Sequence, residues 1–289
     1  MSLLMNHSNT LPICSPTPTN GKLQKDENGV LIFDSTKLQN EPDLPTEFIW
    51  PSEDLVGEEL NEPLIDLSGV LKGDEEAIAT AAELVRTAYS TESLHVVDYL
   101  KSVLGQEFTH TGWVYQRYCE AMGELSQVLL ELLAISLGVD SSHYKEFFKD
   151  ARSIMRCNYY PPCKSSGLTF GTGPHCDPTS LTILYQDDIG GLEVFTDNKW
   201  KAVRPQLDAL VINIGDTFMA LTDGKYKSCL HRALVNQDIE RRSLAFFLCP
   251  KHDKVVRPPK DLFGIKEPRK YPDFTWSDFL GFTQNCYRI

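Results

Sequence analysis

Residues 181–203 read LTILYQDDIGGLEVFTDNKWKAV, which contains three short runs rich in β-branched and aromatic residues. Gly190-Gly191 and Asp197-Asn198 lie between the runs, and residues of this kind are typical of tight turns. The stretch therefore predicts three strands, at Leu181–Tyr185, Leu192–Thr196 and Trp200–Val203.

Four further runs with the same texture surround this stretch. They predict strands at Ile154–Tyr160, Ala209–Ile214, Cys229–Val235 and Ser243–Leu248. Many short strands at close, regular spacing favour a sandwich or a barrel over a parallel sheet. A double-sheet jelly roll, also called a double-stranded β-helix, is the member of that class that fits best.

The first half of the chain has a helical pattern instead, with apolar residues at helical spacing. The expected elements are a strand at Pro63–Leu67 and helices at Asp74–Arg86, Leu94–Val103, Gly112–Leu137 and Ser142–Asp150. The fold class is therefore mainly β with N-terminal helices, a jelly-roll core flanked by helices. We divide the chain into a disordered N-terminal segment at 1–43, a region of one strand and helices at 44–150, and a jelly-roll domain at 151–289.

The composition limits the classes of partner. The 289 residues carry a formal net charge of −12, which would repel a nucleic-acid backbone and an anionic membrane. No apolar run approaches the ~20 residues of a membrane span, and the N-terminus lacks a secretory signal pattern. The eight cysteines form no C-x-x-C pair and are predicted to be reduced thiols. We therefore expect a cytoplasmic monomer that acts on a small molecule.

His175-Cys176-Asp177 is the central chemical signal. In an extended segment, residues two apart project to one face, so His175 and Asp177 can point at a single ion. His231 lies several predicted strands further on and could complete the set. Two neutral imidazoles and one carboxylate on one face leave three open positions on an octahedral metal, as in non-haem iron(II) oxygenases. The H-x-D spacing alone can be incidental, and the same ligands would also serve zinc in a hydrolase.

Arg241 and Ser243 form a second signal, at the start of the strand that follows His231. A guanidinium and a hydroxyl on one face can hold a carboxylate through charge-assisted hydrogen bonds. Because consecutive jelly-roll strands often change sheets, this pair could face His231 across the interior. Asn158 and Tyr160 share a face of an earlier strand, where a bound carboxylate could satisfy the tyrosine hydroxyl. Each of these patterns alone is also compatible with an ordinary strand end.

Several longer stretches carry a family resemblance. They are Asn158–Cys163 (NYYPPC), Leu168–Asp187 (LTFGTGPHCDPTSLTILYQD), Asn213–Ala220 (NIGDTFMA), Tyr226–Ala233 (YKSCLHRA), Ser243–Pro250 (SLAFFLCP) and Tyr271–Trp276 (YPDFTW). Nearer the N-terminus are Leu44–Pro51 (LPTEFIWP), Pro63–Leu67 (PLIDL) and Val114–Met122 (VYQRYCEAM). Together they resemble the plant 2-oxoglutarate-dependent dioxygenases and, among these, the gibberellin 20-oxidase family.

The resemblance implies a role for each candidate residue. It implies an Fe(II) site formed by His175, Asp177 and His231. It also implies a site for the distal carboxylate of 2-oxoglutarate, formed by Arg241 and Ser243 with Tyr160 and Asn158 nearby. The expected reaction is oxidation by O₂ of gibberellin precursors, which are diterpenoid acids, at carbon 20. This reaction belongs to the biosynthesis of a plant hormone, and ascorbate is the expected reductant.

The chain departs from the family pattern after Ala88. The family has a further segment there, with a strand that reads roughly H-G-F-F-x-V-x-N-H-G, whereas this chain continues with Tyr89. Both candidate sites lie outside the gap, so we expect them to form. Without this segment, apolar surface of the main sheet would lose its cover and a strand edge would stay unpaired. We therefore expect reduced stability and weaker gibberellin turnover. Two alternatives stay open: a non-catalytic truncated isoform that keeps the jelly roll and metal site, and a dioxygenase acting on another gibberellin carbon or a flavonoid.

Overall fold

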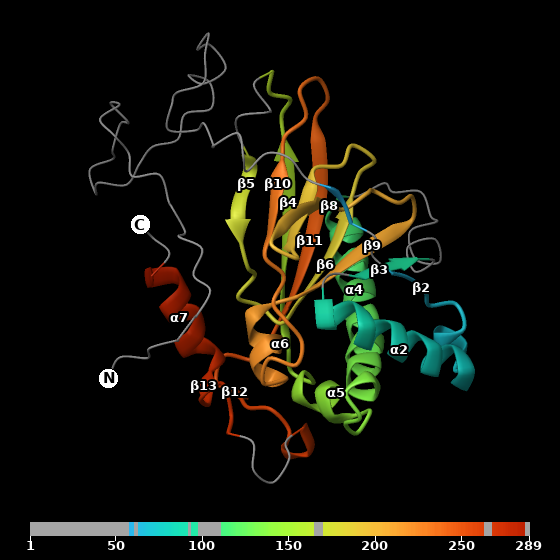
Figure 1. Ribbon diagram of the computed structural model, residues 1–289, viewed down its shortest axis with the longest axis vertical. Helices are drawn as coiled ribbons and strands as arrows, with labels where there is room; N and C mark the ends of the chain where they lie inside the picture. Colours follow the sequence, from blue (N-terminus) through green and yellow to red (C-terminus); the bar gives the residue numbers. More distant parts are fainter. Residues whose placement is uncertain are drawn as a thin grey trace.

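The computed structural model describes residues 58–60, 63–91, 94–97, 111–164, 170–262 and 268–286. The segment at 1–43, predicted to be disordered, lies outside these residues. Within them, two large sheets form the centre of the molecule, and the two longest helices, Glu75–Thr91 and Thr111–Ser136, lie against one side (Figure 1). This arrangement confirms a jelly-roll core flanked by helices.

The smaller of the two large sheets has five strands, and it carries two of the candidate metal ligands. Its order is β1 (Glu58–Glu59), β8 (Lys199–Ala202), β7 (Leu192–Thr196), β10 (His231–Leu234) and β5 (Phe170–His175). All neighbours are antiparallel except β1 and β8. The hairpin between β7 and β8 turns at Asp197 and Asn198, whose φ angles of 51° and 60° suit such a turn.

The larger sheet has six strands and carries the second group of candidate residues. Its order is β2 (Leu64–Asp66), β3 (Leu94–Val97), β9 (Ala209–Ile214), β6 (Leu181–Gln186), β11 (Arg241–Cys249) and β4 (Arg152–Tyr160). Strand β10 belongs to one sheet and the next strand, β11, to the other, as predicted. A separate small sheet pairs β12 (Val255–Val256) with β13 (Phe274–Thr275).

Alternation along the strands divides the apolar residues between two cores. An inner cluster fills the space between the two large sheets and consists of Leu60, Leu184, Leu192, Val194, Val203, Val211, Cys229 and Ala245. Neighbouring residues on the same strands, such as Ile183 and Phe246, face the other way into a larger cluster that includes helix side chains. One face of each large sheet therefore lines the interior of the jelly roll, where the candidate site also lies, and we call this the inner face.

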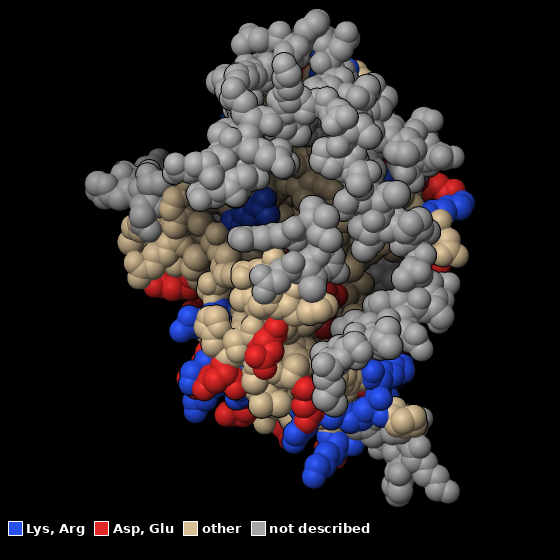
Figure 2. Space-filling view, turned by 90° about the vertical axis from the view of Figure 1, so that its left-hand side faces the viewer, with Lys and Arg blue, Asp and Glu red and all other residues tan. Residues whose placement is uncertain are grey.

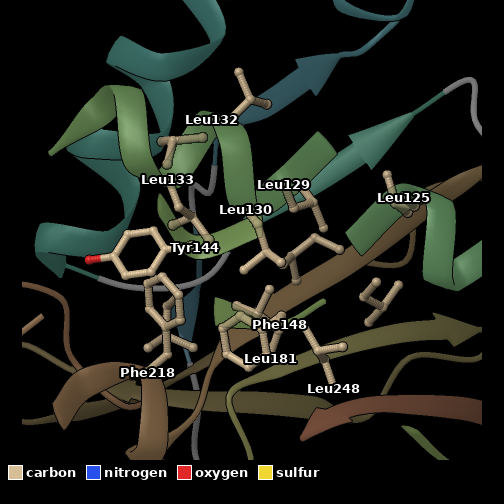
Figure 3. Close-up of a cluster of buried hydrophobic side chains, with 14 of the residues drawn as sticks. Leu125, Leu129, Leu130, Leu132, Leu133, Tyr144, Phe148, Leu181, Phe218 and Leu248 are labelled. Carbon is tan, nitrogen blue, oxygen red and sulfur yellow. The ribbon is translucent and has the colours of Figure 1, made fainter. Parts of the chain in front are cut away.

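Helices cover the outer face of the six-stranded sheet. They are α2 (Glu75–Thr91), α4 (Thr111–Ser136) and the short α5 (His143–Phe147). Figure 3 shows leucines of α4 packed against Leu181 and Leu248 of the sheet, beside Tyr144, Phe148 and Phe218. The remaining helices are α6 (Asp216–Leu221), α7 (Trp276–Cys286) and the 3₁₀ turns at Val70–Lys72 and Lys260–Leu262.

The helix boundaries follow the expected signals. Asp74 caps α2, because its Oδ1 accepts the backbone N–H of Glu76 at 3.0 Å and that of Ala77 at 3.2 Å. The helix continues to Thr91, five residues past the predicted end at Arg86. The long helix α4 ends just before Gly138, which has a φ of 69°, in the left-handed region that favours glycine.

The prediction of a helix at Leu94–Val103 is wrong for its first four residues, and residues 98–103 lie outside the described part of the chain. Residues Leu94–Val97 form β3, which pairs in parallel with β2 and antiparallel with β9. Val96 and Val97 are β-branched and suit a strand, and this position supplies the backbone partners that β2 and β9 both need. Within the described residues, the six-stranded sheet is therefore continuous from β2 to β9.

Two further observations concern the chain as a whole. None of the helices in the described part of the chain is both long and apolar enough to span a membrane. Six cysteines whose side chains are described are free thiols: Cys119, Cys157, Cys163, Cys176, Cys229 and Cys249.

Candidate metal centre

Two neighbouring strands of the five-stranded sheet bring the three predicted metal ligands to one point. His175 is the last residue of β5, Asp177 follows two residues later, and His231 is the first residue of β10, paired directly with His175. The Nε2 atom of His175 lies 3.7 Å from Asp177 Oδ1, and that of His231 lies 3.9 Å from Asp177 Oδ2. One ligand atom from each residue can be chosen so that all three lie within 4.8 Å of one another.

Hydrogen bonds behind the ligands orient each of them. His175 Nδ1 contacts the carbonyl oxygen of Gly173 at 2.8 Å, and His231 Nδ1 contacts that of Cys229 at 3.0 Å. Because a carbonyl oxygen only accepts, each Nδ1 must carry the proton, which leaves the Nε2 lone pair available to a metal. The hydroxyl of Thr182 on β6 donates to Asp177 Oδ2 at 2.5 Å and so fixes the carboxylate.

The electrostatics of the cluster also suit a metal ion. Burial, and then the neighbouring His231, lower the pKa of His175, so its ring stays neutral and able to coordinate. The side chain of Asp177 is 8% exposed and supplies the negative charge of the set. Two neutral imidazoles and one carboxylate are the donor set of non-haem iron(II) sites. The residues present therefore fit Fe(II).

The backbone that follows Asp177 is held by the start of α6, a helix that the sequence did not predict. Asp216 N–H donates to the carbonyl oxygen of Asp177 at 2.8 Å. A side chain at Gly215 would place its Cβ 2.1 Å from the carbonyl oxygen of Thr179 and 2.8 Å from that of Asp177. Glycine at this position therefore allows α6 to approach the metal-binding loop closely.

The second group of predicted residues lies together on the inner face of the six-stranded sheet. In the register of β11 and β4, Arg241 is opposite Tyr160 and Ser243 is opposite Asn158. Asn158 Nδ2 donates to Ser243 Oγ at 3.2 Å, and the guanidinium carbon of Arg241 lies 5.1 Å from the centre of the Tyr160 ring. The four residues predicted from the sequence therefore share one surface.

Gln186 on β6 belongs to this group and was missed. Its Oε1 accepts a hydrogen bond from Arg241 Nη2 at 3.1 Å. Arg241 is 1% exposed, and burial lowers the pKa of its guanidinium. Gln186 Nε2 and Arg241 Nε are buried and have no hydrogen-bond partner among the described residues. A buried cation beside unpaired donors suits an anionic ligand. Strand alternation from Thr182 and Leu184 could have identified Gln186.

Arg156 adds an accessible cation to the same inner face. It pairs with Ala245 of the inner cluster, two residues along β4 from Asn158, and its side chain is exposed. Its charge is close enough to His175 to contribute to the lowered pKa of that ring, after burial and His231. Figure 2 shows a patch of Lys or Arg atoms inside a hollow lined mainly by uncharged atoms.

Comparisons with known proteins agree with this site. Residues 151–250 match the family model of the 2OG-Fe(II) oxygenase superfamily. Gibberellin 20 oxidase 2 of Arabidopsis thaliana is 44% identical over 338 residues, covering 92% of this chain and 89% of the relative. Gibberellin 20 oxidase 2 of Oryza sativa subsp. indica is 63% identical over 193 residues, covering 67% of this chain and 49% of the relative.

A solved structure gives the same result for the fold. The crystal structure of JOX2 in complex with 2OG, Fe and JA superimposes with a TM-score of 0.73 and 25% identity, covering 87% of this chain and 93% of that one. The dioxygenase for auxin oxidation in rice has the same fold at 21% identity, with a TM-score of 0.63 over 78% of this chain and 95% of that one. The chain therefore belongs to the 2OG-Fe(II) oxygenase superfamily, in the branch that includes the gibberellin 20 oxidases.

Proposed function

We propose that this dioxygenase oxidises gibberellin precursors at carbon 20, with Fe(II) as its metal and 2-oxoglutarate as co-substrate. The observation that carries the proposal is the joint presence of a His-Asp-His cluster and a buried arginine on facing sheets of one jelly roll. A zinc hydrolase would need the first but has no use for the second, because hydrolysis requires no diacid co-substrate. The similarity to gibberellin 20 oxidases supports the substrate class.

The protein's part in the reaction is to hold the reactants in place. His175, Asp177 and His231 would coordinate Fe(II) on one face and leave the opposite face open. When bound, the iron and 2-oxoglutarate supply the oxidation: one oxygen atom of O₂ goes to the substrate, the other goes to succinate, and CO₂ is released. The residues of the inner cluster exclude water from the space between the sheets.

Arg241 and Ser243 would hold the distal carboxylate of 2-oxoglutarate. The guanidinium offers a planar pair of donors, which matches the two oxygens of a carboxylate. The Tyr160 hydroxyl lies 3.3 Å from the Thr172 hydroxyl, so these two groups would close the site from the side of β5. Asn158 would act on Ser243, whose hydroxyl oxygen accepts its amide N–H and is thereby directed to donate.

Arg156 is the residue we assign to the carboxylate of the gibberellin. The net charge of −12 repels an acidic substrate, so a local cation has to attract it. Arg156 lies on the inner face near the metal cluster, and its exposed side chain can be reached from solvent. An arginine there would orient the diterpenoid acid with its reacting carbon toward the metal.

The non-catalytic isoform remains the second candidate, for one specific reason. The alignment with the Arabidopsis relative runs over 338 positions, whereas this chain has 289 residues, so the relative has residues that this chain lacks. We propose that these include an internal segment after Ala88 and that its loss weakens turnover. We also propose a cytoplasmic monomer that uses ascorbate as reductant.

The experiment is incubation of the purified chain with C20 gibberellins, Fe(II), ascorbate and 2-oxoglutarate, followed by mass analysis of the products. A gibberellin oxidised at carbon 20, with an equivalent amount of succinate, supports the proposal. Oxidation at another carbon, or of a flavonoid only, would reassign the substrate. Metal and 2-oxoglutarate binding without any oxidised product would identify the non-catalytic isoform.

A further inference from the structure

The strand that carries His231 is also held from its other face, by a buried ion pair. His231 and Arg232 are consecutive in β10, so their side chains project to opposite faces of the five-stranded sheet. Arg232 Nε donates to Glu193 Oε2 at 2.6 Å, and the two side chains are 0% and 4% exposed. Glu193 lies on β7, directly opposite Arg232 in the register.

The same guanidinium contacts aromatic rings on two further strands. Its central carbon lies 4.6 Å from the ring centre of Phe170 on β5 and 4.1 Å from that of Trp200 on β8. Both distances suit a cation–π interaction. Glu193, Arg232, Phe170 and Trp200, which we call the outer-face cluster, thus connect β7, β10, β5 and β8 through their side chains. These are four of the five strands of the sheet.

The backbone pairing between β5 and β10, the two strands that carry the metal-binding histidines, is irregular. Strands β5 and β10 carry His175 and His231, and their register shifts on both sides of Ala233. A slip of one residue in a strand turns every side chain to the other face of the sheet. Such a slip of β10 would move His231 away from the metal cluster. By contrast, the pairing of β10 with β7 is regular through Arg232 and Glu193.

We propose that the outer-face cluster positions His231 for metal binding, with Arg232 as the positioning residue. Glu193 binds Arg232 on the side of β10 that pairs regularly with β7. The contact of Arg232 with Phe170 then fixes the position of β10 relative to β5, where the backbone pairing is irregular. An ion pair buried this completely is a weak source of stability, because both charges lose their hydration. A geometric role explains it better. The inference rests on the metal-ligand role proposed above for His231.

The test replaces both charges at once, in the variant Glu193→Leu/Arg232→Met of the full chain. Removing both partners leaves no unpaired buried charge, so the unfolding midpoint in urea, measured without metal, should stay at or above the wild-type value. The dissociation constant for Co(II) should rise about ten- to a hundred-fold, as expected when support behind a metal ligand is lost. The visible absorption bands of bound Co(II) should also shift, because the position of one imidazole changes.

The matched control is Glu58→Leu/Lys199→Met, which removes an exposed ion pair from the same sheet. Its side chains are 64% and 60% exposed, and its Co(II) affinity and spectrum should equal those of the wild type. A Glu193→Leu/Arg232→Met variant with wild-type affinity and spectrum would overturn the proposal.

A second variant covers the case in which the double variant does not fold. Arg232→Lys keeps the charge but loses the planar group that contacts the two rings. Weaker Co(II) binding with shifted bands in this variant supports the proposal, and unchanged binding and bands contradict it. Equal Co(II) binding by wild type and His231→Ala would instead refute the metal-ligand assignment itself, and with it the positioning role.

Discussion

Replacement of Arg241 by methionine should weaken 2-oxoglutarate binding at least about 30-fold without unfolding the protein. In the ligand-free chain this buried guanidinium donates to a neutral acceptor, the amide oxygen of Gln186 at 3.1 Å, and lies over the ring of Tyr160. Burial lowers the pKa of Arg241, which means that the surroundings disfavour its charge. Replacing such a cation with an apolar side chain of similar length removes the cost of burying its charge, so the ligand-free chain should still fold.

The same substitution should weaken the binding of 2-oxoglutarate, although it leaves the ligand-free fold stable. Losing the cation from a buried charge pair costs about 2–5 kcal/mol, because the carboxylate is then buried without its partner. At about 1.4 kcal/mol per factor of ten, the dissociation constant for 2-oxoglutarate rises about 30-fold to several thousand-fold. One substitution should therefore lower the affinity for 2-oxoglutarate without lowering the stability of the fold.

Thermal unfolding with and without 2-oxoglutarate measures both effects. With Mn(II) as a redox-inert metal and ligand at a hundred times the wild-type dissociation constant, binding adds about 2.7 kcal/mol. For a chain of this size that raises the Tm of the wild type by about 5–10 °C. In Arg241→Met the same ligand concentration should raise Tm by less than about 3 °C.

Arg242→Met is the matched control, because Arg242 is the next residue and points to the opposite face. Its side chain is 67% exposed and pairs with Glu240 at the surface, so the ligand-dependent rise in Tm should be unchanged. Two results would refute the reasoning. A full ligand-dependent rise in Arg241→Met would show that Arg241 does not hold the co-substrate. Loss of folding without ligand would show that its role is structural.

Three further predictions concern the substrate, the metal and the backbone. Arg156→Met should raise KM for a gibberellin acid about ten-fold while leaving the 2-oxoglutarate-dependent rise in Tm intact, and an unchanged KM would remove Arg156 from the substrate site. Thr182→Val should weaken Mn(II) binding about ten-fold, because the carboxylate of Asp177 loses its hydroxyl donor; calorimetry with equal affinities would contradict this. Gly215→Ala should destabilise the fold in urea by about 1–3 kcal/mol or more, since the added Cβ meets backbone carbonyl oxygens, whereas Gly123→Ala on α4 meets nothing within 4 Å and should be neutral or stabilising.

Residue type made most of the jelly roll predictable. The runs from Leu181 to Val203 are rich in β-branched and aromatic residues, and the turns between them contain glycine, aspartate and asparagine. Tertiary pairing decided the exceptions. Leu94–Val97 became a strand because a position between β2 and β9 supplied its hydrogen-bond partners. Strand β5 was not predicted, since FGTGPH has low β-propensity; Gly171 is needed there because a Cβ would lie 2.4 Å from the Tyr160 ring.

The candidate site was predictable to the extent that its residues carry chemistry recognisable without a structure. Two histidines with an aspartate, and an arginine with a serine, are patterns that indicate a metal and a carboxylate. The residues that hydrogen-bond to these groups and hold them in position cannot be recognised from the sequence in this way. Gln186 and Thr182 are ordinary polar residues on β6, and only the three-dimensional register shows that they contact Arg241 and Asp177. Arg232 was missed because its role depends on the face of β10 opposite to the site.

The central claim is that His175, Asp177 and His231 hold Fe(II) while leaving room for 2-oxoglutarate on the same ion. The most direct measurement is the visible spectrum of the purified chain under anaerobic conditions, with Fe(II) and 2-oxoglutarate added separately and together. The account predicts a weak charge-transfer band that needs both additions, is absent with Zn(II), and is lost in His231→Ala. A wild-type spectrum with no such band, or a band that persists in His231→Ala, would contradict it.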